Sequence, residues 1–293
     1  MDNQTHLESK EWKVGLGRQI SNGIATLGMA CAALLVITPL VVIFGYLLYR
    51  GVGSLNWNFI TQIPKPVGET GGGMANAIVG SGMILLIASV IGIPLGIGSG
   101  VFLAEYGRNR YGDLVRFTAD VLNGVPSIVI GTTVWGLLVV TQRHFSMLSG
   151  GVALGIMMVP TVTRSTEEIL LMVPQSVREG AIGLGIAQWR VTISVVLRTA
   201  TAGILTGIML AFARVAGETA PLMFTAFGNQ FWSLSPNQPV GALPLQIFYY
   251  AISAFDDLHR QAWAGALALI VLIVGTIGVV RLFASRGLMK GAV

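Results

Sequence analysis

The chain is poor in the residues that most enzyme chemistry needs. It has one cysteine, Cys31, and three histidines, His6, His144 and His259, scattered along its length. A single cysteine excludes an internal disulfide, and the histidines have no Cys or paired His near them to make a metal site. No Gly-Lys pair occurs, which excludes a phosphate-binding loop of the G-x-x-x-x-G-K-[ST] type. We expect no metal, no cofactor and no catalytic residue in this chain.

Charge is scarce as well. Only 11% of the residues are charged and 53% are hydrophobic, with a mean hydropathy of +0.73. Apolar runs long enough to cross ~30 Å of hydrocarbon recur along the chain. This pattern predicts an all-α polytopic membrane protein with six transmembrane helices. The expected spans are residues 22–49, 74–104, 117–142, 149–172, 199–222 and 262–284.

Polar segments frame the expected spans. Residues 1–21 predict a cytosolic amino-terminal tail, and residues 285–293 predict a cytosolic tail at the other end. Residues 22–73 would form the first transmembrane helix and an external loop, and residues 74–284 the main transmembrane domain. The apolar stretch Gly241–Phe255 is too short to span a bilayer, so it predicts an external interfacial or re-entrant element.

The distribution of Lys and Arg predicts the orientation. With the amino terminus in the cytosol, the external segments contain only Arg50, Lys65, Arg143 and Arg260. The internal segments contain the other Lys and Arg that lie outside the spans, and such an excess is typical of the cytoplasmic side. The net charge of +5 therefore reflects topology and does not indicate nucleic-acid binding.

The internal segment over residues 174–198 has the pattern of a short helix followed by a turn. Ser176 and Glu179 form a capping-box pattern, which predicts that a helix starts just after Ser176. Gly183 and Gly185 predict the end of this helix and a turn toward the next span. A helix-turn-helix on the inner face suits docking to a cytosolic partner, and an ordinary amphipathic connecting loop explains the pattern equally well.

This segment resembles the EAA loop of permeases of ABC importers, whose pattern is Glu-Ala-Ala, three residues, then Gly. The corresponding residues are Glu179, Gly180, Ala181 and Gly185, with Gly180 in place of Ala. Five further stretches, in order, resemble the PstA-type permease subunits of phosphate ABC importers. They are residues 71–82, 93–107, 124–131, 213–221 and 229–233.

The resemblance implies a type I ABC importer permease (MetI-like) fold in the bacterial cytoplasmic (inner) membrane. The chain would pair with a homologous sister permease above a dimer of ATPase subunits, which bind ATP and Mg, and the EAA residues would couple it to them. An external phosphate-binding protein would deliver the substrate, and inorganic phosphate would cross by alternating access. The alternatives are a permease for another oxyanion, sulfate or molybdate, and a secondary transporter driven by an ion gradient.

Two charged residues, Arg214 and Glu218, lie within the fifth expected span. At about 100° per helical residue, they fall with Gly203, Gly207 and Ala211 within an arc of roughly 80°. Small residues allow membrane helices to pack closely, so the charged pair would face the helix bundle. Residues four apart on a helix are also within reach of each other.

We expect Arg214 and Glu218 to line the substrate path. Glu218 would neutralise Arg214 when the path is closed, and the guanidinium would bind a phosphate oxyanion through two parallel hydrogen bonds when it opens. A salt bridge that only locks two helices is the alternative. Pro126 and Ser127 interrupt the third expected span, and a freed carbonyl or the serine hydroxyl would line the path there. A proline kink alone explains them as well.

Other polar residues in the spans suggest structural roles. Asp120 and Asn123 near the start of the third expected span are candidates for buried residues that pair with a neighbouring helix. Glu167 and Glu168 lie near Arg164 at the inner end of the fourth expected span, where a solvated helix end would explain them.

Overall fold

The computed structural model of the chain describes residues 15–66, 68–69 and 71–290. Residues 1–14 of the predicted amino-terminal tail and residues 291–293 of the predicted carboxy-terminal tail lie outside the described residues. The chain divides into two units, Met1–Tyr49 and Arg50–Val293. The first unit holds most of α1 (Leu16–Gly51), one apolar helix of 36 residues with Pro39 inside it.

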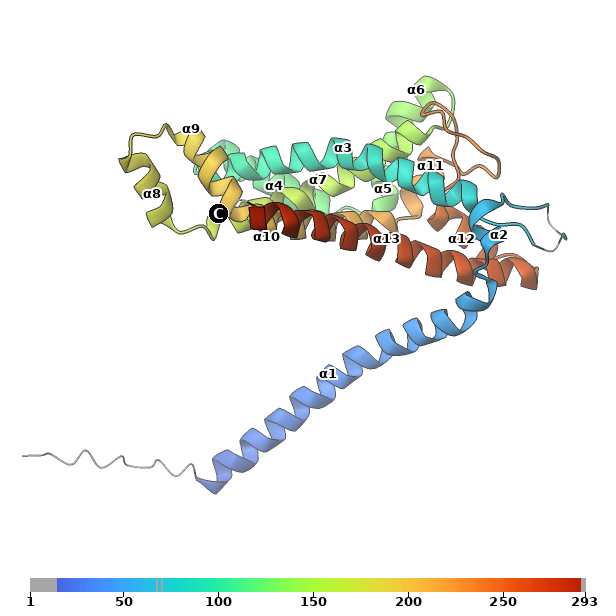
Figure 1. Cartoon of the computed structure of the whole chain (residues 1–293), viewed down its shortest axis with the longest axis horizontal. Helices are drawn as coiled ribbons and strands as arrows, with labels where there is room; N and C mark the ends of the chain where they lie inside the picture. The colour runs from blue at the N-terminus through green and yellow to red at the C-terminus, as the bar shows by residue number, and fades with distance from the viewer. Residues whose placement is uncertain (1–14, 67, 70, 291–293) are drawn as a thin grey trace, which may run out of the picture. The chain divides into compact units, whose positions relative to one another are not determined.

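The second unit is built from helices and loops, and its described part contains one isolated β-bridge, between Phe227 and Val240 (Figure 1). Its long helices are α3 (Ala75–Tyr106), α7 (Met147–Leu171), α10 (Leu197–Ala216) and α13 (Asp256–Lys290). Its shorter α-helices are α2 (Trp57–Thr61), α4 (Arg110–Gly124), α5 (Ser127–Val134), α6 (Val140–Gln142), α8 (Gln175–Gly183), α9 (Gln188–Val191), α11 (Ala220–Thr225) and α12 (Leu243–Ala251).

The structure agrees with the six predicted membrane spans when one bent helix pair is counted as a single span. Five helical segments are long and apolar enough to cross a membrane, and a sixth is a bent pair, Arg110–Gly124 with Ser127–Gln142. The two halves of this pair meet at 103°, so the interruption at Pro126 is a break in the span and more than a proline kink. Proline lacks a backbone N–H and forces the preceding residue away from helical angles, and Val125 is extended at φ −68° and ψ 130°.

A row of glycines joins α3 to α7. Gly92, Gly96 and Gly100 lie on one face of α3, and a Cβ atom added to any of them would come within 2.8 Å of a side-chain atom of α7. At Gly96 the distance to the Cβ of Val162 would be 2.6 Å. Small residues bring membrane helices close enough for extensive van der Waals contact. The two helices therefore form one closely packed pair, which we call the α3–α7 pair.

Two glycine substitutions in α3 are expected to have opposite effects. Gly96→Ala should lower the stability of the purified protein by about 1–3 kcal/mol, because the new methyl group overpacks the contact with α7. Gly98→Ala is the matched control, since nothing lies within 4 Å of a Cβ there, and alanine favours a helix by up to ~1 kcal/mol. Thermal unfolding in mild detergent measures both, and equal shifts for the two variants would contradict the packing role.

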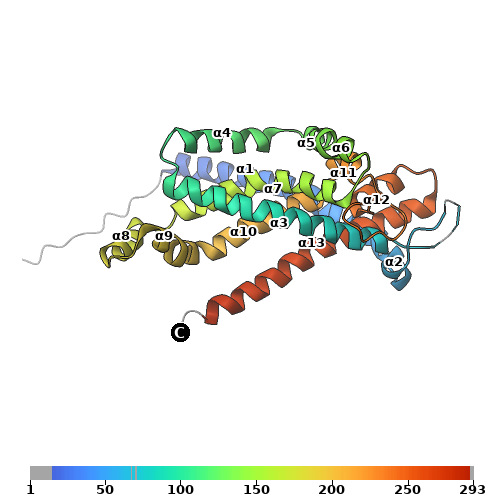
Figure 2. The ribbon, with the colours of Figure 1, turned by 90° about the horizontal axis from the view of Figure 1, so that it is seen from above.

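Four of the short helices lie at the two ends of the second unit. In both ribbon views α8 and α9 lie at one end, and α2 and α12 at the other (Figures 1 and 2). The short apolar stretch predicted over Gly241–Phe255 contains the nine-residue helix α12. Its position at a membrane surface stays a prediction.

Candidate functional site

The structure separates Arg214 from Glu218. Arg214 lies in the last turn of α10, which ends at Ala216, and Glu218 lies in the connection to α11. The prediction that both residues share one face of a continuous helix is therefore wrong. Gly217 caps α10, and Pro221 occupies the first turn of α11, a combination that commonly ends one helix and starts another.

The side chain of Arg214 is exposed, and that of Glu218 is half-buried. Among the described residues, no carboxylate lies within 4.0 Å of the Arg214 guanidinium. The predicted neutralisation of Arg214 by Glu218 is thus absent from this conformation. The same finding gives no support to a salt bridge that locks two helices of this chain.

The stripe of small residues that leads to Arg214 is a packing surface, as predicted. A Cβ on Gly203 would lie 2.6 Å from a side-chain carbon of Ile169, and one on Gly207 would lie 2.5 Å from the Cβ of Ser165. Ala211 is fully buried. The stripe therefore packs α10 against α7 and leaves Arg214 beyond the end of this contact.

The break between α4 and α5 and the break between α10 and α11 belong to helices that pack together. A Cβ on Gly131 of α5 would lie 2.6 Å from the Cα of Pro221 of α11. Pro126 caps the start of α5, and Ser127 is its first residue. Interrupted helices at membrane depth are tolerated where they are covered by protein or line a cavity. The candidate path residues are thus distributed over two broken helices in contact.

A buried charge cluster lies at the α4–α7 contact. Glu167 is 3% exposed and accepts hydrogen bonds from Arg116 Nε at 2.6 Å and from Arg164 Nη1 at 2.8 Å. Asp113 lies 3.2 Å from Arg116, and Asp120 lies 3.1 Å from Arg164. The expectation of a solvated helix end is therefore wrong for Glu167, because two arginines cover its carboxylate.

The predicted pairing of α4 with a neighbouring helix is confirmed. Besides the ion pair of Asp120 with Arg164, the Thr161 hydroxyl donates to Asn123 Oδ1 at 3.3 Å. The side chain of Asp120 is 54% exposed, so it was wrongly expected to be buried.

The predicted helix-turn-helix is present as α8, residues 184–187 and α9, which together we call the docking segment. Gly185 has φ +79°, a left-handed conformation that suits glycine, and it ends the turn as predicted. The capping box is absent, because α8 begins at Gln175 after Pro174 and no side chain caps it. Glu179 and Gly180 are exposed. Ala181 is half-buried against a cluster of buried apolar side chains that includes Leu170 and Val191.

The one basic residue of α8, Arg178, is largely covered by the chain. It forms an ion pair with Glu105 of α3, and their side chains are 12% and 7% exposed. Neither residue stands out as a site residue in the sequence, because the two are 73 positions apart and no local pattern links them. Arg178 is thus the charged contact between the docking segment and the long helices.

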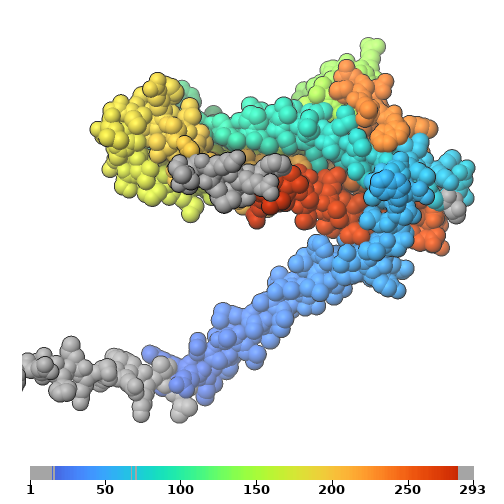
Figure 3. All heavy atoms as spheres, viewed as in Figure 1, coloured from blue at the N-terminus to red at the C-terminus, as the bar shows by residue number. Residues whose placement is uncertain are grey.

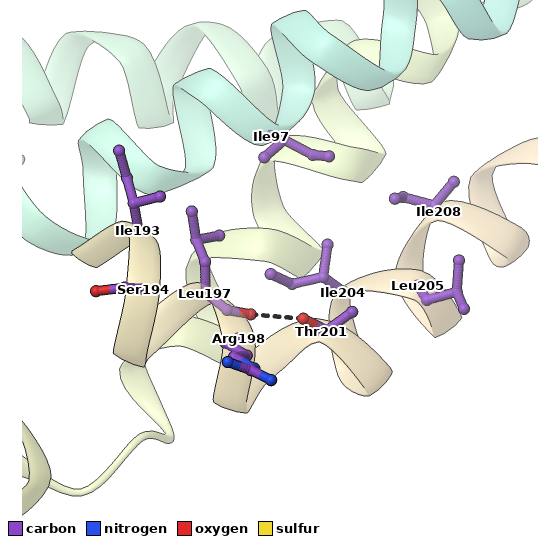
Figure 4. A pocket seen from close by; sticks show the side chains of 9 residues that line it. All are labelled: Ile97, Ile193, Ser194, Leu197, Arg198, Thr201, Ile204, Leu205 and Ile208. Atoms are coloured by element: carbon purple, nitrogen blue, oxygen red, sulfur yellow. Dashed lines mark hydrogen bonds between the residues drawn. The ribbon is translucent and has the colours of Figure 1, made fainter. Parts of the chain in front are cut away.

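Two cavities lie in different parts of the second unit. One, of about 470 Å³, lies beside the inner part of α10, with Ile97 and Ile204 in its apolar wall and Ser194 and Arg198 among its lining residues (Figure 4). Another, of about 370 Å³, lies between α12 and the loop before it and includes the Tyr250 side chain. Burial raises the pKa of the Tyr250 hydroxyl above its ordinary value, and the hydrogen bond from Gln246 opposes this effect.

Comparison with known proteins gives several matches. Residues 92–287 match the model of a family described as "Binding-protein-dependent transport system inner membrane component". A phosphate transport system permease protein PstA of Yersinia pestis is 42% identical over 92% of this chain and 92% of the relative. The PstA protein of Haemophilus influenzae is 45% identical, over 78% of this chain and 80% of the relative. A probable ABC transporter permease, YqgI of Bacillus subtilis, is 36% identical over 72% of each chain.

A solved structure shares the fold. A chain from inward-facing conformations of the MetNI methionine ABC transporter superposes with a TM-score of 0.52, over 84% of this chain and 97% of that chain. The two sequences are 17% identical, so the likeness concerns the fold alone.

Proposed function

Because the chain belongs to the family of binding-protein-dependent transport system inner membrane components, we propose that it is a permease subunit of an ATP-driven importer for inorganic phosphate. Relatives 42–47% identical over most of the chain carry the name of phosphate permeases, which supports this substrate. The importer acts in the bacterial cytoplasmic membrane, with both termini in the cytosol. The distribution of Lys and Arg between the two sides supports this orientation.

The chain works with partners. A homologous sister permease completes the pore, a dimer of ATPase subunits binds ATP and Mg, and an external phosphate-binding protein delivers the anion. This chain binds no cofactor and contributes no catalytic residue. The docking segment supports an ATPase partner, since Glu179, Leu184 and Trp189 are exposed. The segment lies at the surface at one end of the second unit, where its atoms are coloured yellow in Figure 3.

The observation that carries the proposed path is the unpaired guanidinium of Arg214. Arg214 lies in the last turn of an apolar helix, and arginines within membrane segments commonly face a polar cavity or substrate path. Arg214 is exposed, and no described carboxylate neutralises it. Its planar fork of donors fits two oxygens of a phosphate anion. Glu218 lies just beyond the helix, and its negative charge repels the bound anion. This repulsion keeps the affinity of the site for phosphate low enough for release.

Displacement of the docking segment by the ATPase moves the helices that line the substrate path. ATP binding closes the ATPase dimer, and the ATPase displaces α8 through Glu179, Gly180, Ala181 and Gly185. The helices then rock around the site, so that Arg214 faces first the outside and then the cytosol. Pro126 and Ser127 at the break between α4 and α5 offer a carbonyl and a hydroxyl along the same path.

Uptake of labelled phosphate tests the function. Cells that lack their own high-affinity phosphate system should take up phosphate when this chain is expressed with its partners, and excess unlabelled sulfate or molybdate should not compete. Uptake of labelled sulfate or molybdate in cells that take up no phosphate would assign another oxyanion. Purification in mild detergent is the second measurement, because a transporter driven by an ion gradient would carry no ATPase with it.

A further inference from the structure

The Arg178 side chain contacts two long helices at once. One terminal nitrogen, Nη1, pairs with the Glu105 carboxylate near the end of α3. The other, Nη2, donates to the backbone carbonyl of Leu170 at 2.6 Å, near the end of α7. Glu105 also accepts a hydrogen bond of 3.4 Å from the Thr192 hydroxyl, at the start of the fifth span. The guanidinium therefore connects α8 directly with the ends of α3 and α7, and Glu105 links this contact to the start of the fifth span.

The environment of this contact makes it costly to break. The side chains of Arg178 and Glu105 are 12% and 7% exposed, so separation would leave two charges in a largely dry site. Removing one partner of a buried ion pair is far more damaging than removing a surface pair, because the other charge stays uncompensated. The guanidinium also satisfies the Leu170 carbonyl, whereas a lysine would supply only a point charge.

The helices held by Arg178 are those of the α3–α7 pair, which glycine contacts join along their length. Displacement of α8 thus displaces both helices together. By contrast, Glu179 is exposed, and no described residue holds its side chain. The two neighbouring residues have different surroundings: Glu179 is open to a partner, and Arg178 faces the interior of this chain.

We propose that Arg178 and Glu105 are positioning residues that transmit the movement of the docking segment to the α3–α7 pair. The proposal rests on the proposed ATP-driven function, since it takes the ATPase as the source of the movement. The pair does not touch the substrate. It makes α8 and the inner end of α3 move as one body during the transport cycle.

A distance measurement that needs no substrate tests this proposal. Spin labels are attached at Leu184 and Tyr106, both exposed, after Cys31→Ser removes the native thiol. In the purified complex the distance should be the same without nucleotide and with bound ATP. In Arg178→Gln it should change by more than the width of the distance distribution. A change in the wild-type pair, or a constant distance in the variant, would overturn the proposal.

Transport is the second readout. In proteoliposomes, Arg178→Gln and Glu105→Gln should each lower the phosphate taken up per ATP hydrolysed by about tenfold, and the double variant should be no worse than either, because both act through one contact. Arg108→Gln is the matched control, an exposed arginine at the same end of α3. Uptake per ATP that stays at the control level would overturn the proposal.

Two further results separate this proposal from the function on which it rests. Wild-type complex that hydrolyses ATP and keeps the distance constant, but moves no phosphate, would reject the substrate and leave the transmission role intact. If Arg178→Gln does not assemble, Arg178→Lys and Glu105→Gln are measured instead. Loss of assembly in all three variants would show that the pair has only a structural role and would overturn the proposal.

Discussion

Arg214→Gln is expected to abolish phosphate uptake while the complex with the ATPase still assembles. The guanidinium makes two charge-assisted hydrogen bonds to the anion in the proposed path. At about 1.5–3 kcal/mol each, their loss corresponds to a roughly 100-fold or larger fall in uptake at limiting phosphate. Assembly should survive, because Arg214 is exposed and forms no ion pair with any described residue of its own chain.

Three matched variants sharpen the measurement. Arg214→Lys keeps the charge but loses the planar fork, so an intermediate uptake is expected. Arg110→Gln removes an exposed arginine at the start of α4 and should leave uptake near the wild-type level. Glu218→Gln should change uptake without loss of the complex. Normal uptake in Arg214→Gln would show that the anion path runs elsewhere, and loss of the complex in Glu218→Gln would indicate a structural role for that residue.

Glu167→Gln is expected to have the largest effect on stability. The substitution removes the one carboxylate that contacts both Arg116 and Arg164 and leaves their charges close together. Breaking a fully buried pair costs ~3–5 kcal/mol, and we expect about 2–4 kcal/mol because both arginines keep some exposure to solvent. For a chain of this size, this predicts a fall in the unfolding temperature of about 3–7 °C.

The neighbouring residue supplies the control. Glu168 is exposed, so Glu168→Gln should leave the unfolding temperature of the detergent-purified complex almost unchanged. In the double variant Arg116→Gln with Glu167→Gln, the loss should be smaller than the sum of the single losses, because the two residues share one contact. Additive losses, or equal effects at Glu167 and Glu168, would contradict the network.

The spans could be predicted from the sequence because their signal is local. An apolar run of about 20 residues needs no knowledge of its neighbours. Proline geometry marks Pro126 as a candidate interruption, but Pro94 and Pro160 lie inside continuous helices, so the sharp break at Pro126 could not be told from a simple kink by sequence. The end of α10 was also encoded locally. Gly217 followed by Pro221 is the pattern of a helix that stops and restarts, and it was outweighed by the apolar character of the surrounding run.

The charge contacts could not be predicted in this way. Glu167 and Arg116 are 51 residues apart, and Arg178 and Glu105 are 73 apart, so their pairing depends on how the helices are arranged. Taken alone, each residue fits a solvated helix end. Arg214 was recognised because it lies inside an apolar run, yet its separation from Glu218 required the backbone. Local sequence thus located the charges, and only the packing of helices assigned their partners.

The glycine contacts of the α3–α7 pair also have a consequence for biosynthesis. Translation at roughly 5–20 residues per second needs about 2–8 s for the roughly 40 residues between the end of α3 and the start of α7. During this time α3 is present without its partner, so it must enter the bilayer as an independent span. Alanine at Gly96 would therefore not hinder insertion. The defect would appear later, as a chain that is inserted but not packed, and that quality-control proteases remove from the membrane.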